Sequence, residues 1–223
     1  MHSQAVLDSW HANAAEWSQV IATNAIASRK LVTNAAIVSA IQQYATSGTI
    51  VDVGCGEGWL SRALHGLQYP VYGVDAIPQL IATAKELAPG IPYYVADYQA
   101  LATQGLPSPA EAAVCNFCLI DEEHTQLLLP ALAKQLTGNK WLFIQTLHST
   151  MANGSQPYKT GWRSGSWDGL PGHFTQPYQW YFRTLESWVS LLVSSGFQLV
   201  QVLEPLHPET NLPASYIFVC KAL

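Results

Sequence analysis

The sequence predicts an α/β domain with a mostly parallel sheet. Two observations support this class: strand-like and helix-like segments alternate along the 223 residues, and most strand-like segments are continuous apolar runs. Such runs are typical of strands that helices cover on both faces. The length suffices to bury one sizeable core, so we expect a single domain.

Seven segments have the composition of strands, and helix-like segments separate them. The expected strands are residues 49–53, 70–74, 91–96, 112–119, 140–147, 197–203 and 215–220. The expected helices are residues 58–66, 78–87, 124–136 and 184–195. The last of these ends at Gly196, a residue that favours helix ends. The chain before Thr49 is expected to be helical, and Ser28 is placed to cap a helix with the apolar positions Leu31, Ala35, Val38 and Ile41.

The stretch from His148 to Gln179 fits no regular element. It is rich in Gly, Pro and Ser but also in aromatic residues, which disordered segments lack. Its ring-bearing residues include Tyr158, Trp162, Trp167, His173, Phe174 and Tyr178. We therefore expect one domain, residues 1–223, made of N-terminal helices (1–48), a core (49–147), an aromatic-rich lid or substrate insertion (148–183) and a C-terminal helix with strands (184–223).

Composition excludes several function classes. Only 11% of the residues are charged, and ten Lys and Arg against fifteen Asp and Glu give a net charge of −5. No run of basic residues exists, which argues against nucleic-acid binding. No apolar window of about eighteen residues could span a membrane. The N-terminus lacks the pattern of a secretory signal, so we expect a cytoplasmic protein.

The most informative segment is TIVDVGCGEGWLSRAL, residues 49–64, in which a strand runs into three glycines and then a helix. Glycine permits a sharp turn and lets a ligand approach the backbone, and the N–H groups of a helix start attract polar ligand groups. A dinucleotide-binding turn is G-x-G-x-x-G. Here Trp59 stands where its third glycine would be, which disfavours a nicotinamide ligand.

Two carboxylates follow the next two strands. Asp75 ends VYGVD, about twenty residues after the first glycine, where a carboxylate can accept hydrogen bonds from both hydroxyls of a ribose. Asp97 ends IPYYVAD and precedes Tyr98. Open α/β sheets bind ligands at this carboxyl edge. The sequence therefore predicts a nucleoside site.

The motifs VDVGCGEG, VYGVDAIPQL and VADYQAL resemble those of the class I S-adenosylmethionine-dependent methyltransferases, and the resemblance extends from about Trp10 to the C-terminus. The segment WYFRTLESWVSLLVSSGFQLVQVLEP is similar to the one that precedes the last strand in their small-molecule members. The resemblance implies a Rossmann-like sheet of seven strands with an antiparallel last strand, and S-adenosylmethionine as cofactor. By position it implies the cofactor-binding residues Asp52, Gly54, Cys55, Gly56, Gly58, Asp75, Ala76, Asp97, Tyr98, Asn116 and Phe117.

The resemblance also implies roles for these residues. The three glycines would lie near the methionine part, Asp75 on the ribose, Asp97 on the adenine amine and Tyr98 beside the adenine. Asn116 and Phe117 would lie beside the methionine moiety or the transferred methyl group. Asp52 looks like the acid that orients the loop or meets the cofactor's amino group.

Some of these residues have a second interpretation. Asp97 could instead cap a helix. Trp10 and Trp17 could close over the cofactor or pack an N-terminal helix. Arg29 could reach the cofactor carboxylate or remain solvated at a helix start.

The expected reaction is methyl transfer to a small organic acceptor at oxygen or nitrogen. A hydroxyl acceptor needs a base, for which we select His148 first and His173 second; an amine or carboxylate needs none. The Asn-Pro-Pro-Tyr motif of enzymes that methylate amino groups on nucleobases or glutamine is missing, because Phe117 and Cys118 follow Asn116. The alternatives are an NAD(P)-binding oxidoreductase and a non-catalytic S-adenosylmethionine-binding protein.

Cys115 and Cys118 form a C-x-x-C, a pattern also found in zinc and redox sites. Residues three apart in a strand point to opposite faces, so we expect these thiols not to converge. The histidines also lack ligand spacing, and we expect no metal site.

Overall fold

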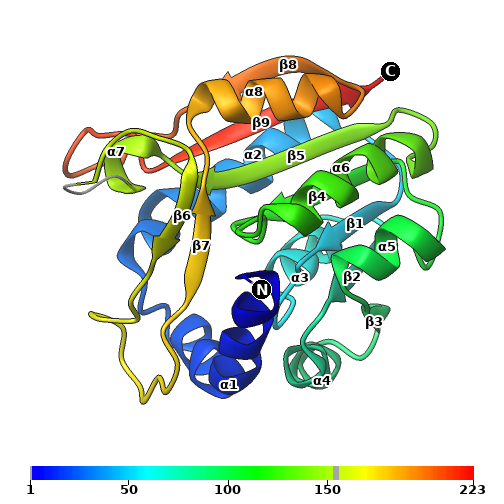
Figure 1. Ribbon diagram of the computed structural model, residues 1–223. Coiled ribbons are helices and arrows are strands. Elements are labelled where there is room, and N and C mark those ends of the chain that lie inside the picture. The colour runs from blue at the N-terminus through cyan, green and yellow to red at the C-terminus, as the bar shows by residue number, and fades with distance from the viewer. Residues whose placement is uncertain (1, 153–155) are drawn as a thin grey trace.

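The computed structural model describes residues 2–152 and 156–223 (Figure 1). The main sheet has the strand order β3-β2-β1-β4-β5-β9-β8. All neighbours up to β5 pair in parallel, and β9 runs antiparallel to both β5 and β8. The predicted α/β fold, its seven-stranded sheet and its antiparallel last strand are therefore confirmed. The strands are β1 (Ile50–Val53), β2 (Val71–Asp75), β3 (Tyr93–Val95), β4 (Ala112–Asn116), β5 (Trp141–Leu147), β8 (Phe197–Leu203) and β9 (Ser215–Ala222).

Helices cover both faces of this sheet and explain the apolar runs. In β1, Ile50 belongs to the core under α2 (Asn34–Tyr44), α3 (Trp59–Gly66) and α4 (Pro78–Leu87). Its neighbour Val51 belongs to the core on the other face, under α5 (Tyr98–Gln104), α6 (Glu123–Gln135) and α8 (Leu185–Ser194). Because successive strand residues point to opposite faces, both must be apolar.

Helix α1 (His2–Ala22) lies outside these two layers. Its Ala14 packs with Ile77 and Leu80 at the start of α4, and Trp10 and Trp17 pack against the same group. Figure 1 shows α1 beyond the end of the sheet, near the tip of the insertion. This position brings α1 to the edge where the strands end.

The turn before α2 differs from the prediction. Residues Arg29–Thr33 form a π-helix, η1, and Ser28 makes no capping hydrogen bond with its side chain. A π-turn holds one residue more than an α-turn, so it changes which side chains of the following helix, α2, face the core. Of the expected apolar stripe, Ile41 is buried but Leu31 and Ala35 are exposed, and Thr33 and Ile37, which lie outside that stripe, are buried.

The insertion contains more regular structure than expected. Strands β6 (Gly161–Ser164) and β7 (Gln179–Phe182) pair antiparallel in a second sheet, and α7 (Ser149–Ala152) precedes them. Aromatic residues favour strands, and Trp162 lies opposite Tyr181 in this ribbon. In Figure 1 the ribbon reaches from the end of β5 toward α1. The stretch from His148 to Gln179 is thus not wholly irregular.

Within the described part of the chain, no helix is both long and apolar enough to cross a membrane.

Candidate functional site

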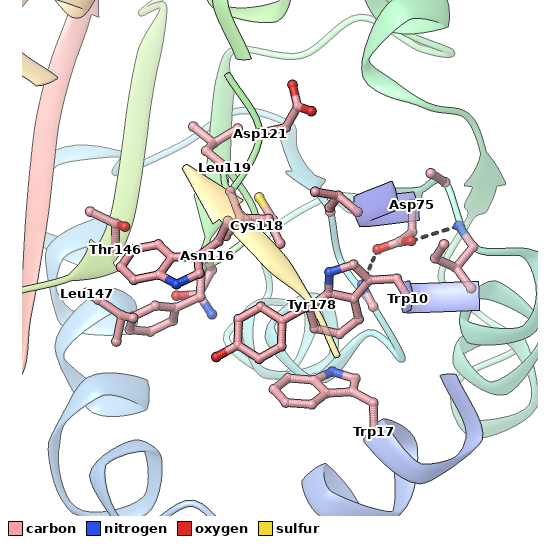
Figure 2. A pocket seen from close by; sticks show the side chains of 18 of the residues that line it. Trp10, Trp17, Asp75, Asn116, Cys118, Leu119, Asp121, Thr146, Leu147 and Tyr178 are labelled. Atoms are coloured by element: carbon pink, nitrogen blue, oxygen red, sulfur yellow. Dashed lines mark hydrogen bonds between the residues drawn. The ribbon is translucent and has the colours of Figure 1, made fainter. Parts of the chain in front are cut away.

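A cavity of about 390 Å³ lies at the carboxyl ends of the central strands (Figure 2). Its floor, by which we mean Gly54, Gly56, Asp75 and Asn116, comes from the ends of β1, β2 and β4. Its roof, by which we mean Trp10, Trp17, Trp167 and Tyr178, comes from α1 and the insertion.

The glycine turn follows β1 and opens the floor. Gly54 has a φ of 69° and Gly56 a φ of 58°, a region that other residues rarely adopt. A Cβ on Gly54 would lie 2.4 Å from the Cβ of Cys118, so only glycine fits there. Gly58 serves differently: it does not line the cavity, and its Cβ would meet the hydroxyl of Tyr93.

Asp75 ends β2 and is fixed in place by the backbone. Its Oδ2 accepts a hydrogen bond from the Gly56 N–H at 2.8 Å, and its Oδ1 accepts one from the Ile77 N–H at 2.9 Å (Figure 2). Burial raises the pKa of this carboxyl, and the two hydrogen bonds oppose the shift. Each oxygen keeps a lone pair with which a hydroxyl group could pair. Ala76 lines the cavity beside it.

Asp97 and Tyr98 line the next part of the cavity. Asp97 caps α5, because its Oδ1 accepts a hydrogen bond from the Ala100 N–H at 2.7 Å. The structure thus supports the capping interpretation and also leaves Asp97 at the cavity. The Tyr98 hydroxyl donates to the carbonyl of Cys118 at 3.0 Å, which ties the start of α5 to the end of β4.

Asn116 and Phe117 line the cavity where β4 ends. The strand stops at Asn116 rather than at Leu119, because Phe117 adopts a φ of 54° and turns the chain. The Asn116 Oδ1 is buried without a hydrogen-bond partner among the described residues. Figure 2 places Asn116 across the cavity from Asp75. A ligand that donates a hydrogen bond would satisfy this oxygen.

The same turn overturns the prediction for the two cysteines. Cys118 no longer continues the strand, and its thiol donates to the carbonyl of Val53 at 3.0 Å. A hydrogen bond with Cys118, together with burial, raises the pKa of the Cys115 thiol. The two thiols therefore converge, and both are free. The prediction was wrong because it extended β4 past Asn116.

Asp52 lies beneath the floor and does not line the cavity. It is 1% exposed, and its Oδ2 accepts a hydrogen bond from the Ser61 hydroxyl in α3 at 2.7 Å. Burial raises the pKa of Asp52 to about 7, and the Ser61 hydrogen bond opposes the shift. Of its two predicted roles, the geometry fits the one that orients the loop.

Arg29 lines the cavity beside the glycine turn. Its guanidinium lies over the ring of Trp59, 5.0 Å from the centroid, and 5.9 Å from that of Trp17. Its Nη2 is buried and has no hydrogen-bond partner among the described residues. Burial lowers the pKa of Arg29, whereas the charge of Glu57 raises it. A guanidinium that is buried and has an unpaired N–H donor favours an anionic ligand group.

The four aromatic side chains of the roof form one cluster. Trp10 packs edge-on against Trp17 at 5.1 Å and against Trp167 at 5.3 Å, measured between ring centroids. Tyr178 lies 4.6 Å from Trp167. Figure 2 shows Trp10, Trp17 and Tyr178 close together on one side of the cavity. Trp10 and Trp17 thus meet the insertion as well as packing α1.

Neither histidine selected as a base lines the cavity. His148 is 5% exposed and engages both ring nitrogens, Nε2 with the Glu204 Oε1 at 2.8 Å and Nδ1 with the Thr150 Oγ1 at 2.7 Å. His173 lies in an exposed part of the insertion. Among the described histidines, only His124 lines the cavity, at the start of α6. No motif or spacing around His124 indicates this role.

Among residues 2–152 and 156–223, no group of three or more His, Cys, Asp or Glu side chains could hold a metal ion.

Comparison with known proteins agrees with this geometry. Residues 50–138 match the family described as “Methyltransferase domain”. Over 109 residues the chain is 33% identical to the ubiquinone biosynthesis O-methyltransferase of Xylella fastidiosa (strain M23), covering 46% of this chain and 43% of that protein. Over 104 residues it is 32% identical to the trans-aconitate 2-methyltransferase of Methylobacterium nodulans, covering 45% and 39%. The chain thus spans less than half the length of these relatives.

Solved structures share the fold across more of the chain. The DhpI-SAM-HEP complex has a TM-score of 0.70 at 14% identity and covers 99% of this chain and 97% of its own. An S-adenosylmethionine-dependent methyltransferase structure from Listeria monocytogenes, called putative, has a TM-score of 0.67 at 16% identity, with coverages of 86% and 100%. Residues 50–138 thus match a methyltransferase domain, and the chain shares the fold of S-adenosylmethionine-dependent methyltransferase structures.

Proposed function

We propose that this chain is a methyltransferase that uses S-adenosylmethionine to methylate a small organic acceptor at oxygen or nitrogen. One observation carries the proposal: the Asp75 carboxylate is held at the cavity by the N–H groups of Gly56 and Ile77. A carboxylate fixed beside a bare glycine turn is suited to the hydroxyls of a ribose.

Two unpaired buried atoms support the same cofactor. The Arg29 Nη2 is a donor without a partner, and the Asn116 Oδ1 is an acceptor without one, within the described chain. The amino-acid part of S-adenosylmethionine carries a carboxylate and an ammonium group, which match this donor and this acceptor. Asp97 and Tyr98 are left to hold the adenine. When bound, the cofactor supplies a methyl group on a positively charged sulfur.

The chain's contribution is to hold the acceptor in line and exclude water. The aromatic roof supplies an apolar wall that favours a small acceptor with a flat or apolar part. The names of the relatives, which refer to ubiquinone biosynthesis and trans-aconitate, support an acceptor of this size. The net charge of −5 favours this acceptor over nucleic acid.

All four segments of the chain contribute to the fold around this cavity, and we propose that they act as one methyltransferase domain. The cytoplasmic location expected from the sequence stays a prediction.

For a hydroxyl acceptor, we propose that His124 takes the proton in place of His148 or His173. It lines the cavity, and its Nδ1 lies 3.8 Å from the Asp121 Oδ1. His124→Asn should lower turnover of a hydroxyl acceptor at least about 100-fold, a typical contribution of a general base. Turnover of an amine acceptor should be unchanged. His65→Asn, at an exposed site, is the matched control.

The test of the function is a screen of phenols, amines and carboxylic acids for release of S-adenosylhomocysteine. We expect turnover in at least one of these classes. A chain that binds the cofactor but turns over none of them would be a binding protein and not an enzyme. If His124→Asn retains full turnover on a hydroxyl acceptor, the assignment of the base is wrong.

A further inference from the structure

Asn13 of α1, which is 0% exposed, joins α1 to the insertion. Its Nδ2 donates to the carbonyl of Gln176 at 2.8 Å, and its Oδ1 accepts a hydrogen bond from the Thr175 N–H at 2.8 Å. These partners lie more than 160 residues further along the chain. Asn13 therefore pairs with both kinds of backbone group in the insertion.

A carboxamide side chain is suited to this pair of contacts. It offers a donor and an acceptor side by side, whereas an aspartate offers acceptors alone and a leucine neither. Asparagine is also unfavourable inside a helix, so its place within α1 indicates that these contacts are what it supplies.

Further hydrogen bonds converge on the same peptide group. The carbonyl of Gln176 also accepts from the Ser9 hydroxyl at 3.2 Å and from the Trp167 Nε1–H at 2.6 Å. One carbonyl thus links α1, through Ser9 and Asn13, to the ring of Trp167. The position of that ring depends directly on this junction.

The junction also sets the rest of the roof. Trp167 stacks on Phe174 at 4.6 Å and contacts Tyr178 at 4.6 Å, both centroid to centroid. From the other side it meets Trp10 of α1 at 5.3 Å. Trp10, Trp167 and Tyr178 all line the cavity.

We propose that Asn13 is a positioning residue for methyl transfer, which sets the acceptor wall of the cavity by holding Trp167 and Tyr178 against α1. The inference rests on the proposed function. Asn13 lies outside residues 50–138, the part of the chain that matches the methyltransferase family. Asn13 acts on the acceptor and not on the cofactor, because Asp75 and its backbone partners come from β2 and the glycine turn.

The test compares Asn13→Ala, Asn13→Asp and Ser9→Ala with the control Gln4→Ala, which removes an exposed hydrogen bond to Asp8 in the same helix. Steady-state kinetics use the best acceptor from the screen, and calorimetry gives the affinity for S-adenosylhomocysteine. In Asn13→Ala we expect the acceptor KM to rise at least tenfold, with affinity for S-adenosylhomocysteine within about threefold of wild type. Ser9→Ala should show a smaller rise in KM, and it keeps the test open if Asn13→Ala does not fold.

Two results would overturn the proposal. One is an acceptor KM in Asn13→Ala and Ser9→Ala equal to that of Gln4→Ala. The other is a rise in acceptor KM accompanied by parallel falls in S-adenosylhomocysteine affinity and in melting temperature, which would mark Asn13 as structural only. Acrylamide quenching of tryptophan fluorescence decides the matter even if no acceptor is turned over: quenching must increase in Asn13→Ala and not in Gln4→Ala. Absence of turnover in wild type would count against the proposed function instead.

Discussion

The floor and the roof of the cavity are held by contacts that span very different distances along the chain. On the floor, Gly56 and Asp75 are 19 residues apart, and the Gly56 N–H donates a hydrogen bond to the Asp75 carboxylate just beyond the ends of the adjacent strands β1 and β2. In the roof, Asn13 and Gln176 are 163 residues apart and are joined through one side chain. A floor built on two glycines at positive φ tolerates few substitutions, whereas a roof made of aromatic side chains from α1 and the insertion can vary with the acceptor. We therefore expect that cofactor affinity and acceptor affinity can be altered separately.

The largest expected effect comes from the glycine turn. Gly54→Ala would place a Cβ 2.4 Å from the Cβ of Cys118 at a positive φ, so the free energy of unfolding should fall by about 2–5 kcal/mol. Gly56→Ala has the same sign of φ, but its Cβ meets nothing nearer than the Trp17 Nε1 at 4.0 Å. It should cost only about 1–2 kcal/mol, the strain of the left-handed backbone. Urea unfolding of both variants measures the difference; equal losses would show that packing under the floor does not distinguish the two glycines.

The second effect concerns the acid beneath the floor. Burial raises the pKa of Asp52 to about 7 from the model-compound value of 3.8, so the folded chain holds a proton that the unfolded chain releases above about pH 4. The contribution of Asp52 to stability is therefore most favourable below pH 4 and falls as the pH rises to 7. Asp52→Asn keeps an oxygen for the Ser61 hydroxyl without this penalty. Relative to wild type, it should gain on the order of 2–4 kcal/mol between pH 4 and pH 8.

Urea unfolding of wild type and Asp52→Asn across this pH range measures that gain. A constant difference between the two proteins would mean that Asp52 does not titrate in this interval.

The third and smallest expected effect is on the affinity for S-adenosylmethionine alone. Arg29→Met keeps much of the side-chain volume over Trp59 but removes the charged donor. Affinity for S-adenosylmethionine should fall by about 1.5–3 kcal/mol, the range for a hydrogen bond to a charged group, while the acceptor KM stays unchanged. Calorimetry and steady-state kinetics on the same variant separate the two quantities. A change in the acceptor KM alone would show that Arg29 acts on the acceptor, as the roof does. That result would contradict the distinction between floor and roof.

The floor was largely readable from the sequence because its signals are local. The turn at Gly54 and Gly56 and the carboxylate of Asp75 lie where strand and helix periodicity predicts them, and the structure brings them to one cavity. The mostly parallel sheet followed from the alternation of elements, and its seven strands with an antiparallel last strand followed from the resemblance of the motifs.

The predictions that were wrong failed for physical reasons that a local sequence pattern does not indicate. The left-handed residue Phe117 ended β4 early and turned Cys118 back toward Cys115. Residues Arg29–Thr33 formed a π-helix in place of the expected α-helical start after Ser28. The partners of Asn13 and of His148 are distant in the chain, so pairing could not be inferred without coordinates.

The most direct test of the central claim is calorimetric titration of the wild-type chain with S-adenosylmethionine and, in parallel, with NAD. We predict saturable binding of one S-adenosylmethionine per chain and no binding of NAD. Binding of NAD, or no heat with S-adenosylmethionine under conditions where the chain is folded, would contradict the assignment of this cavity.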